Sequence, residues 1–418
     1  MEQVLKRNSL KKNFNWNFIG NLIYAATQWG LIIVMTRFGS VEMVGVFSLG
    51  LAVTGPIIMF TNLQLRTVQA TTQDKSFHFS EFLAVRILAN IIFCLILFIL
   101  IFTSDYEEYT IFIICLVAVS KIIESLSDLA YGLFQQKERM ELIAKSTILR
   151  GLSSLFIVLI IVYFTNNLIA ALIGLIVCWF LVLIFYDIKN VYRFSVKFRP
   201  VFKKKEIISI IKLSLPLGIV VMIVSLNTNL PKILIENMID AEALGYFASI
   251  SYLVFIGSKF INSIGNAMLP RLAILYEKGN RKNYNKYLLI LVSISAMIGV
   301  ILTLASYFGG KYILYIIYGS EFVSYRNLFV LIMVYGTFNY ISYSLVVGLN
   351  AMRKFKIQPY LGIIWLTISA ISLLLLIPKY GLIGAAWSLI IYSVSRILTV
   401  CIVLYLNLKS KEYSRLEE

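Results

Sequence analysis

Twelve apolar runs, each about as long as a membrane-crossing helix, dominate this sequence. A helix needs roughly 20 residues to cross the hydrocarbon core of a bilayer. Hydrophobic residues make up 59% of the 418 residues and charged residues only 14%, whereas about a quarter of a soluble domain is charged. The chain is therefore predicted to be an all-α polytopic membrane protein. Its twelve predicted transmembrane helices span residues 14–36, 43–65, 82–102, 109–131, 144–164, 168–187, 209–229, 243–268, 287–309, 327–349, 357–378 and 381–407.

The basic residues of the connections predict how these helices are oriented. Lysine and arginine are enriched in the cytoplasmic loops of membrane proteins. Of the 38 lysines and arginines, 29 fall in the connections and terminal segments on the side of the N-terminus. Five fall on the other side, namely Arg37, Lys232, Lys311, Arg326 and Lys379. Both termini are therefore expected in the cytoplasm, and the net charge of +17 reflects this asymmetry rather than nucleic-acid binding.

A short phrase occurs twice, once in each half of the sequence. SVEMVGVFSLG (40–50) and DAEALGYFASI (240–250) share a Glu, a Gly and a Phe at one constant spacing. Two further pairs follow in the same order and at similar, slightly larger spacings. They are YGLFQQKERM (131–140) with VGLNAMRKFK (347–356), and NLIAALIGLIV (167–177) with GLIGAAWSLII (381–391).

These matches predict an internal duplication. A shift by six helices preserves the direction of each helix, so the two halves are expected to be parallel six-helix repeats. We expect an N-terminal lobe at 1–187, a basic cytoplasmic linker at 188–208 and a C-terminal lobe at 209–418. This plan is typical of transporters that rock two lobes around a central site.

Four stretches of the chain carry a family likeness. They are the Glu42-x-x-Gly45-x-Phe47 phrase, TNLQLRTVQATT (61–72), SDLAYGLFQQKERMELIAKSTILRG (127–151) and IPKYGLIGAAWSLII (377–391). In these stretches the chain resembles Wzx-type oligosaccharide flippases, which belong to the multidrug/oligosaccharidyl-lipid/polysaccharide exporter superfamily. The similarity extends over the whole chain.

The resemblance implies a V-shaped, two-lobe fold similar to the MATE and MurJ transporters. It implies that an undecaprenyl-diphosphate-linked oligosaccharide moves from the inner to the outer leaflet of the bacterial cytoplasmic membrane, for O-antigen, capsule or a related polymer. The implied partners are this lipid, the membrane lipids and a polysaccharide polymerase. Coupling to H⁺ or Na⁺ stays open, and no cofactor is expected. The family's cavity is lined chiefly by the first, second, seventh and eighth helices.

Polar residues inside apolar helices point to the same cavity. Charged groups at mid-bilayer depth are costly and usually face a cavity or a partner. Lys259, Asn262 and Asn266 lie on one helical face. An ammonium group suits a diphosphate and amides suit sugar hydroxyls, so these residues are predicted to bind substrate. The alternative is a lysine paired with an acidic neighbour.

Other polar residues of the first, second, seventh and twelfth helices allow two interpretations. Asn17, Asn21 and Gln28 either line the substrate cavity or stabilise helix packing, and Asn227 and Asn229 belong either to a flexing element or to static packing. Arg66 either binds the lipid diphosphate at the cytoplasmic mouth or is an ordinary interfacial arginine. Pro216 and Pro231 bracket part of the seventh helix and predict a flexing element there. These further cavity candidates are Asn17, Asn21, Gln28, Arg66, Asn227, Asn229 and Arg396. Arg396 lies too deep to reach the interface and needs an internal partner or an anionic ligand.

Charged residues of the third and fourth helices predict a structural ion pair. Arg86 and Asp128 lie at similar depth on adjacent antiparallel helices, so a clamp between them is the simpler account. Lys121 and Glu124 share the face of Asp128 and extend this ladder. An ion-coupling site is the alternative.

Two other function classes fit the sequence less well. A small-molecule drug or cation antiporter needs membrane acids for the exchanging ion, and these are scarce outside Glu124 and Asp128. A membrane polymerase or glycosyltransferase usually carries catalytic residues on sizeable outer loops, which are short here. No Walker loop, nucleophile elbow or metal-ligand cluster occurs in the sequence. The chain is therefore expected to be a transporter rather than an enzyme.

Overall fold

The computed structural model describes residues 10–71 and 77–413, and these residues form helices without a β-strand. Eleven of the described helices are long and apolar enough to cross a membrane. The protein is therefore an all-helical polytopic membrane protein. Four basic residues that entered the predicted charge asymmetry lie outside the described residues, namely Lys6, Arg7, Lys75 and Arg415.

The chain divides into two compact units, residues 1–229 and 230–418. The first contains α1 (Leu10–Phe38), α2 (Val41–Thr61), α3 (Leu65–Thr71), α4 (Phe79–Phe102), α5 (Glu108–Gln136), α6 (Met140–Thr165), α7 (Leu168–Val182), the π-helix η1 (Leu183–Ile188), α8 (Lys189–Tyr192) and most of α9 (Lys204–Met238). The second contains the end of α9, α10 (Ala241–Glu277), α11 (Arg281–Ile317), η2 (Ser320–Tyr325), α12 (Arg326–Ala351), η3 (Phe355–Ile357) and α13 (Gln358–Tyr413).

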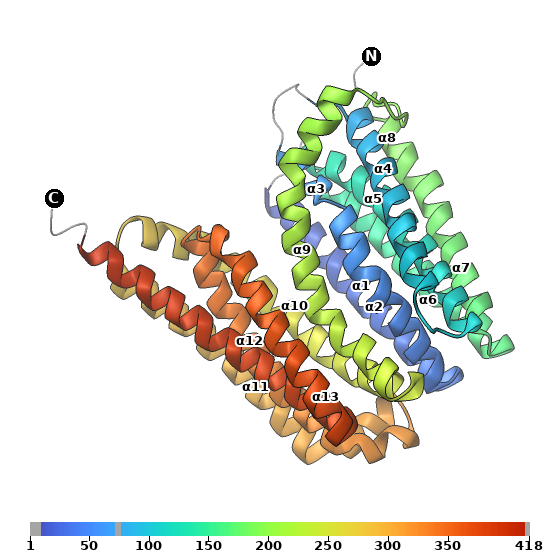
Figure 1. Ribbon diagram of the computed structural model, residues 1–418. Helices are drawn as coiled ribbons and strands as arrows, with labels where there is room; N and C mark the ends of the chain where they lie inside the picture. The colour runs from blue at the N-terminus through green and yellow to red at the C-terminus, as the bar shows by residue number, and fades with distance from the viewer. Residues whose placement is uncertain (1–9, 72–76, 414–418) are drawn as a thin grey trace. The chain divides into compact units, whose positions relative to one another are not determined.

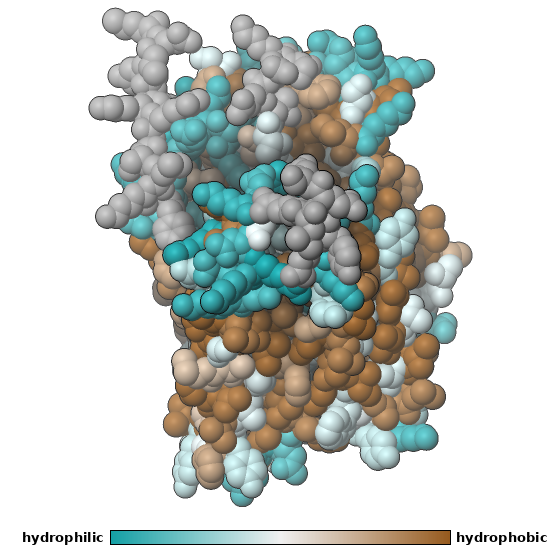
Figure 2. Space-filling model, turned by 90° about the vertical axis from the view of Figure 1, so that its left-hand side faces the viewer, coloured by the Kyte–Doolittle hydropathy of each residue, from teal (hydrophilic) through white to brown (hydrophobic). Residues whose placement is uncertain are grey.

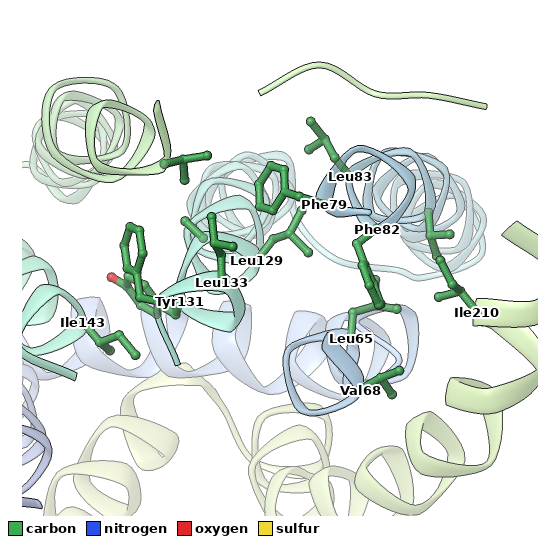
Figure 3. Packing of buried hydrophobic residues seen from close by; sticks show 14 of the residues in the cluster. Leu65, Val68, Phe79, Phe82, Leu83, Leu129, Tyr131, Leu133, Ile143 and Ile210 are labelled. Atoms are coloured by element: carbon green, nitrogen blue, oxygen red, sulfur yellow. The ribbon is translucent and has the colours of Figure 1, made fainter. Parts of the chain in front are cut away.

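Within the first unit, the long helices run lengthwise beside one another (Figure 1). Helix α1 packs on α6, α2 packs on α4 and α5, and α7 packs on α5 and α6. The core at one end joins α3, α4, α5 and α9 through apolar side chains that point toward one another, among them Leu65, Phe82, Leu133 and Ile210 (Figure 3). This core fixes the helix ends that carry the charged residues described below.

The segment after α8 packs against the first unit. The Phe198 ring lies 5.6 Å from that of Phe79, and the Val201 amide donates to the Ser80 carbonyl at 3.0 Å. Lys203 Nζ donates to Glu81 Oε1 at 3.0 Å. Phe194, Val196 and Phe198 alternate with polar residues and cover the apolar core. The sequence predicted a linker at 188–208, whereas the division into units falls inside α9 because these side chains attach the segment to the first unit.

Within the second unit, α12 packs against α10, α11 and α13. Its apolar core joins Leu272, Leu288, Leu349 and Trp365 from all four helices. Helix α13 is 56 residues long but contains non-helical backbone at Gly381, with φ 56° and ψ −133°. Glycine adopts this left-handed region without a steric penalty, so α13 consists of two helices that meet at Gly381.

The repeated phrase begins equivalent helices. Ser40 caps α2 by accepting a hydrogen bond from the Met43 amide at 3.2 Å. Asp240, at the matching position of the second copy, caps α10 by accepting from the Ala243 amide at 2.6 Å. Serine and aspartate are preferred at such positions because they satisfy free amides of the first turn. The prediction that both copies mark a helix start is confirmed.

The molecular surface is apolar over broad areas. Figure 2 shows one face on which hydrophobic side chains form a wide expanse and hydrophilic ones gather mainly above it. Phenylalanine side chains on α4 and α6 are largely exposed, including Phe98, Phe102, Phe156 and Phe164. Soluble proteins rarely expose such large apolar patches, so these side chains are suited to contact lipid chains.

Candidate functional site

The predicted substrate residues of α10 lie in the second unit. Lys259 is exposed, and its Nζ lies 4.7 Å from the centroid of the Phe255 ring. No acidic side chain forms an ion pair with Lys259 among the described residues, so the acidic partner considered as an alternative is not found there. Asn262 has a buried Oδ1 without a hydrogen-bond partner in the described part of the chain. Asn266 is exposed, and the three side chains follow one another on one face of α10.

The predicted polar residues of α1 and α9 lie in the first unit. Asn21 Nδ2 donates to Asn17 Oδ1 at 3.1 Å, and both residues are exposed. Gln28 has a buried Nε2 that finds no partner among the described residues. These α1 amides are not engaged with a neighbouring helix through any hydrogen bond of the described residues.

On α9, both asparagines bond to their own helix. Asn227 donates to the Ile223 carbonyl and Asn229 to the Ser225 carbonyl, each at 2.9 Å. Gly55 of α2 faces Asn229 so closely that an added Cβ would lie 3.1 Å from Nδ2. Asn229 thus contributes to packing between α2 and α9. Helix α9 continues through both Pro216 and Pro231, and their predicted flexing role stays a prediction.

Asp128 is shared by two arginines. Its Oδ2 lies 3.5 Å from Arg86 Nη2, and its Oδ1 lies 3.4 Å from Arg66 Nη1. The predicted ion pair of Arg86 and Asp128 is confirmed. Arg86 is fully buried and also donates to Asn62. Arg66 also donates to Gln135 at 3.1 Å, so in this structure its guanidinium is engaged within the first unit.

The chain bends sharply just before Arg66. Leu63 and Gln64 have positive φ values of 52° and 51°, in the left-handed region. Such backbone is strained for residues other than glycine, by roughly 1–3 kcal/mol each. The break ends α2 and begins α3, and it turns Arg66 toward Asp128 and the Tyr131 ring, 5.6 Å away.

A second charged cluster lies deeper in the first unit. Lys121 Nζ lies 2.8 Å from Glu124 Oε2, as expected from their spacing. Glu124 is also close to Tyr24 and Arg150, and Arg150 is close to Asp187. Arg150 and Asp187 are fully buried, and Asp187 lies beside the hydroxyl groups of Ser127 and Ser146.

The sequence did not predict that Arg150 and Asp187 are buried charged residues close to each other. Arg150 was counted among the basic groups of the cytoplasmic connections, although the structure buries it inside α6. Asp187 lies on η1, a π-helix, and such segments often accompany functional positions. The burial of Arg150 could have been predicted from its position inside the helix predicted at 144–164.

Arg396 has an aromatic partner. Its guanidinium lies 5.1 Å from the Trp365 ring, and its buried Nε has no hydrogen-bond partner in the described part of the chain. Trp365 Nε1 in turn donates to Thr399 Oγ1 at 2.9 Å. Arg396 therefore has an internal partner, and this partner is an aromatic ring rather than an acidic side chain.

Lys203, which lies just before α9 and outside the helices, has a shifted pKa. The hydrogen bond and charge of Glu81 raise the pKa of Lys203, because a carboxylate neighbour favours the ammonium form. Glu81 also accepts from the His78 amide at 2.9 Å. No cluster of three or more metal-ligating residues occurs among the described residues.

Solved structures with the same fold are transporters. A MATE multidrug resistance transporter of the MOP superfamily, in an inward-facing conformation, superposes with a TM-score of 0.67 at 12% identity, covering 95% of this chain and 96% of that one. The lipid II flippase MurJ superposes with a TM-score of 0.70 at 15% identity, covering 93% of this chain and 87% of MurJ. At these identities the likeness shows the fold alone.

Sequence comparison is more specific. The family model described as "Polysaccharide biosynthesis protein" matches residues 10–276. The capsular polysaccharide biosynthesis protein CapF of Staphylococcus aureus is 31% identical over 393 residues, covering 91% of this chain and 95% of CapF. The Wzx-like resemblance expected from the sequence is confirmed. The chain belongs to the polysaccharide biosynthesis protein family and has the fold of the MOP superfamily transporters.

Proposed function

We propose that this protein is a flippase for an undecaprenyl-diphosphate-linked oligosaccharide. It moves the lipid-linked repeat unit from the inner to the outer leaflet of the bacterial cytoplasmic membrane by alternating access, for assembly of a capsule or a related surface polysaccharide. The observation that carries the proposal is the relationship to CapF, a capsular polysaccharide biosynthesis protein, over 91% of the chain. The shared fold with a lipid II flippase supports it.

The proposed architecture has twelve transmembrane helices. Dividing the last of the eleven candidate spans at Gly381 gives this number. The capped helix starts at Ser40 and Asp240 support two parallel six-helix repeats. The charge asymmetry supports cytoplasmic termini, and removing the buried Arg150 from the count leaves it almost unchanged.

The proposed substrate residues are the cation and amides of α10. Lys259 keeps its charge available because its described contact is a ring, not an acid. Its ammonium would bind a phosphate oxygen, and Asn262 and Asn266 would bind sugar hydroxyls. The polyprenyl chain would remain among membrane lipids. A polymerase would consume the product, and an H⁺ or Na⁺ gradient would drive the cycle.

Deleting the gene in its own host tests the proposal. We expect loss of the surface polymer, together with lipid-linked repeat units that stay in the inner leaflet. Such units react with a membrane-impermeant periodate probe only after the cells are opened. Complementation with the wild-type chain should restore both readouts. Normal polymer in the deletion strain, or full labelling in intact cells, would refute the assignment.

A further inference from the structure

A buried arginine of the first unit lies over a tryptophan of the next helix. The guanidinium of Arg150, on α6, lies 5.1 Å from the ring of Trp179, on α7. Both side chains are buried, and the Tyr131 ring lies on the guanidinium at 5.9 Å. A desolvated cation is attracted to the face of an aromatic ring, and tryptophan is the strongest partner. The contact therefore ties α6 to α7.

The second unit contains the same contact with the two residue types on opposite helices. Trp365 lies before Gly381 and Arg396 after it, so they belong to the two helices that α13 joins. Their separation, 5.1 Å, equals that of Arg150 and Trp179. In both arginines Nε is buried and has no hydrogen-bond partner among the described residues. Each guanidinium thus lies beside an aromatic ring although its Nε–H donates no hydrogen bond in the described part of the chain.

In the first helix of each pair, Arg150 and Trp365 lie equally far before the residue at which the two helices join. Each pair of helices is joined at a left-handed residue, Asn166 with φ 47° and Gly381 with φ 56°. The interval from Arg150 to Asn166 equals the interval from Trp365 to Gly381. The spacing between Arg150 and Trp365 also falls between the spacings of the second and third repeated sequence pairs.

The second helix of each pair agrees to within one turn. When the match of NLIAALIGLIV (167–177) with GLIGAAWSLII (381–391) is continued along the chain, Trp179 falls opposite Ser393. Arg396 follows one turn later, on the same helical face. Helical side chains lean toward the N-terminus, so the Arg396 side chain points back toward the turn of Ser393. A small serine stands where the first half has tryptophan, and the indole volume is supplied by Trp365 on the facing helix.

We propose that Arg150–Trp179 and Trp365–Arg396 are one clamp, built in each half with arginine and tryptophan on exchanged helices. The clamp positions the last two helices of each half as one rigid pair. This inference rests on the proposed duplication. The acidic surroundings differ, because Glu124 and Asp187 lie near Arg150, whereas Arg396 has rings near it. The ring contact is the element that the halves share.

The second half gives the cleaner test, because no acid complicates it. The melting temperature of the purified full-length chain is measured for Trp365→Arg, Arg396→Trp and the double variant. Trp365→Arg brings two guanidinium groups together and is expected to melt lowest. The double variant restores one cation and one ring, in the order found in the first half. It should recover roughly 2–4 °C or more relative to Trp365→Arg.

Three further variants keep the outcome decisive. Trp365→Arg with Ser393→Trp and Arg396→Ser places the tryptophan opposite Trp179 and 28 residues after the arginine, against 29 in the first half, in case the simple exchange does not fit. Trp387→Leu, on the same helix pair with a largely exposed indole, is the control for loss of a tryptophan and should shift the melting temperature less than Trp365→Leu.

Two readouts separate this inference from the proposed function. If both exchanged variants melt no higher than Trp365→Arg alone, the clamp is refuted. Surface polymer, measured in the complemented deletion strain, should return in whichever exchanged variant recovers stability. Recovered stability in a protein whose deletion leaves the polymer normal would support the clamp and refute the flippase.

Discussion

The substitution Asp128→Ala should destabilise the protein strongly, because two arginines depend on one carboxylate. Arg86 is fully buried, and its Nη2 lies 3.5 Å from Asp128 Oδ2. Without Asp128, the buried guanidinium keeps only Asn62 as a polar partner among the described residues. Removing one member of a buried ion pair costs about 3–5 kcal/mol.

The loss of unfolding free energy expected for Asp128→Ala lies near the lower end of that range. The Asp128 side chain is 30% exposed, so water partly replaces it, and we expect about 3 kcal/mol. For a unit of this size, each kcal/mol lowers the melting temperature by roughly 2–4 °C. Asp128→Ala should therefore melt about 6–12 °C below the wild type.

Arg66→Ala is the matched comparison. Arg66 and Asp128 are each 30% exposed, and such ion pairs contribute up to about 1 kcal/mol. This variant should lose only about 2–4 °C, because Asp128 still pairs with Arg86. The double variant Arg86→Met and Asp128→Leu removes both charges of the pair and should melt close to the wild type.

The assay is thermal unfolding of the detergent-purified chain. After heating to each temperature, the fraction of protein that still elutes as a monodisperse peak is measured. Equal shifts for Asp128→Ala and Arg66→Ala would refute the reasoning, since they would mean that burial of Arg86 does not set the cost. A double variant as unstable as Asp128→Ala would refute it equally.

Three further predictions concern the substrate, the packing and the segment after α8. Lys259→Ala should abolish surface polymer while the protein still inserts, and Lys259→Arg should retain part of it; normal polymer in Lys259→Ala would exclude the residue from transport. Gly257→Ala should lower the melting temperature by about 2–6 °C, because its Cβ would displace the Tyr340 hydroxyl, which donates to the Val254 carbonyl at 3.0 Å. Gly309→Ala has room for its Cβ and should not lower it. Glu81→Ala should speed tryptic cleavage at Arg193 and Lys197 more than Lys203→Met does, because Glu81 is buried whereas Lys203 is 53% exposed; equal rates would refute the role of Glu81 in holding this segment through Lys203 and the His78 amide.

The helices were predictable because their signals are local. Apolar runs of sufficient length predicted every described transmembrane helix, and the repeated phrase predicted where α2 and α10 begin. The pair of Arg86 and Asp128 was also predictable, because depth along two adjacent antiparallel helices places both residues side by side. Only periodicity, length and connection order enter these inferences.

The contacts that were missed depend on helix ends and tertiary packing. Helices α10 and α11 have 37 residues each, well beyond the roughly 20 that cross the hydrocarbon core, so charged residues near predicted ends become interior residues of long helices. Arg150 is the clearest case, since it was counted with a cytoplasmic connection although it lies inside the helix predicted at 144–164, and α6 begins at Met140 and buries it. The attachment of 193–203 through Phe194 and Phe198 likewise requires knowing which core they reach.

The partners of the cations within the helices distinguish the two units. In the first unit, Arg66 and Arg86 share Asp128, and Arg150 lies near Glu124 and Asp187. In the second unit, Lys259 and Arg396 contact rings, which carry no net charge and leave the positive charge uncompensated. An anion gains more from a cation that no carboxylate neutralises. A substrate carrying a diphosphate should therefore depend more on Lys259 than on Arg66, and this is why α10, rather than the start of α3, is the place where loss of one charge should stop transport.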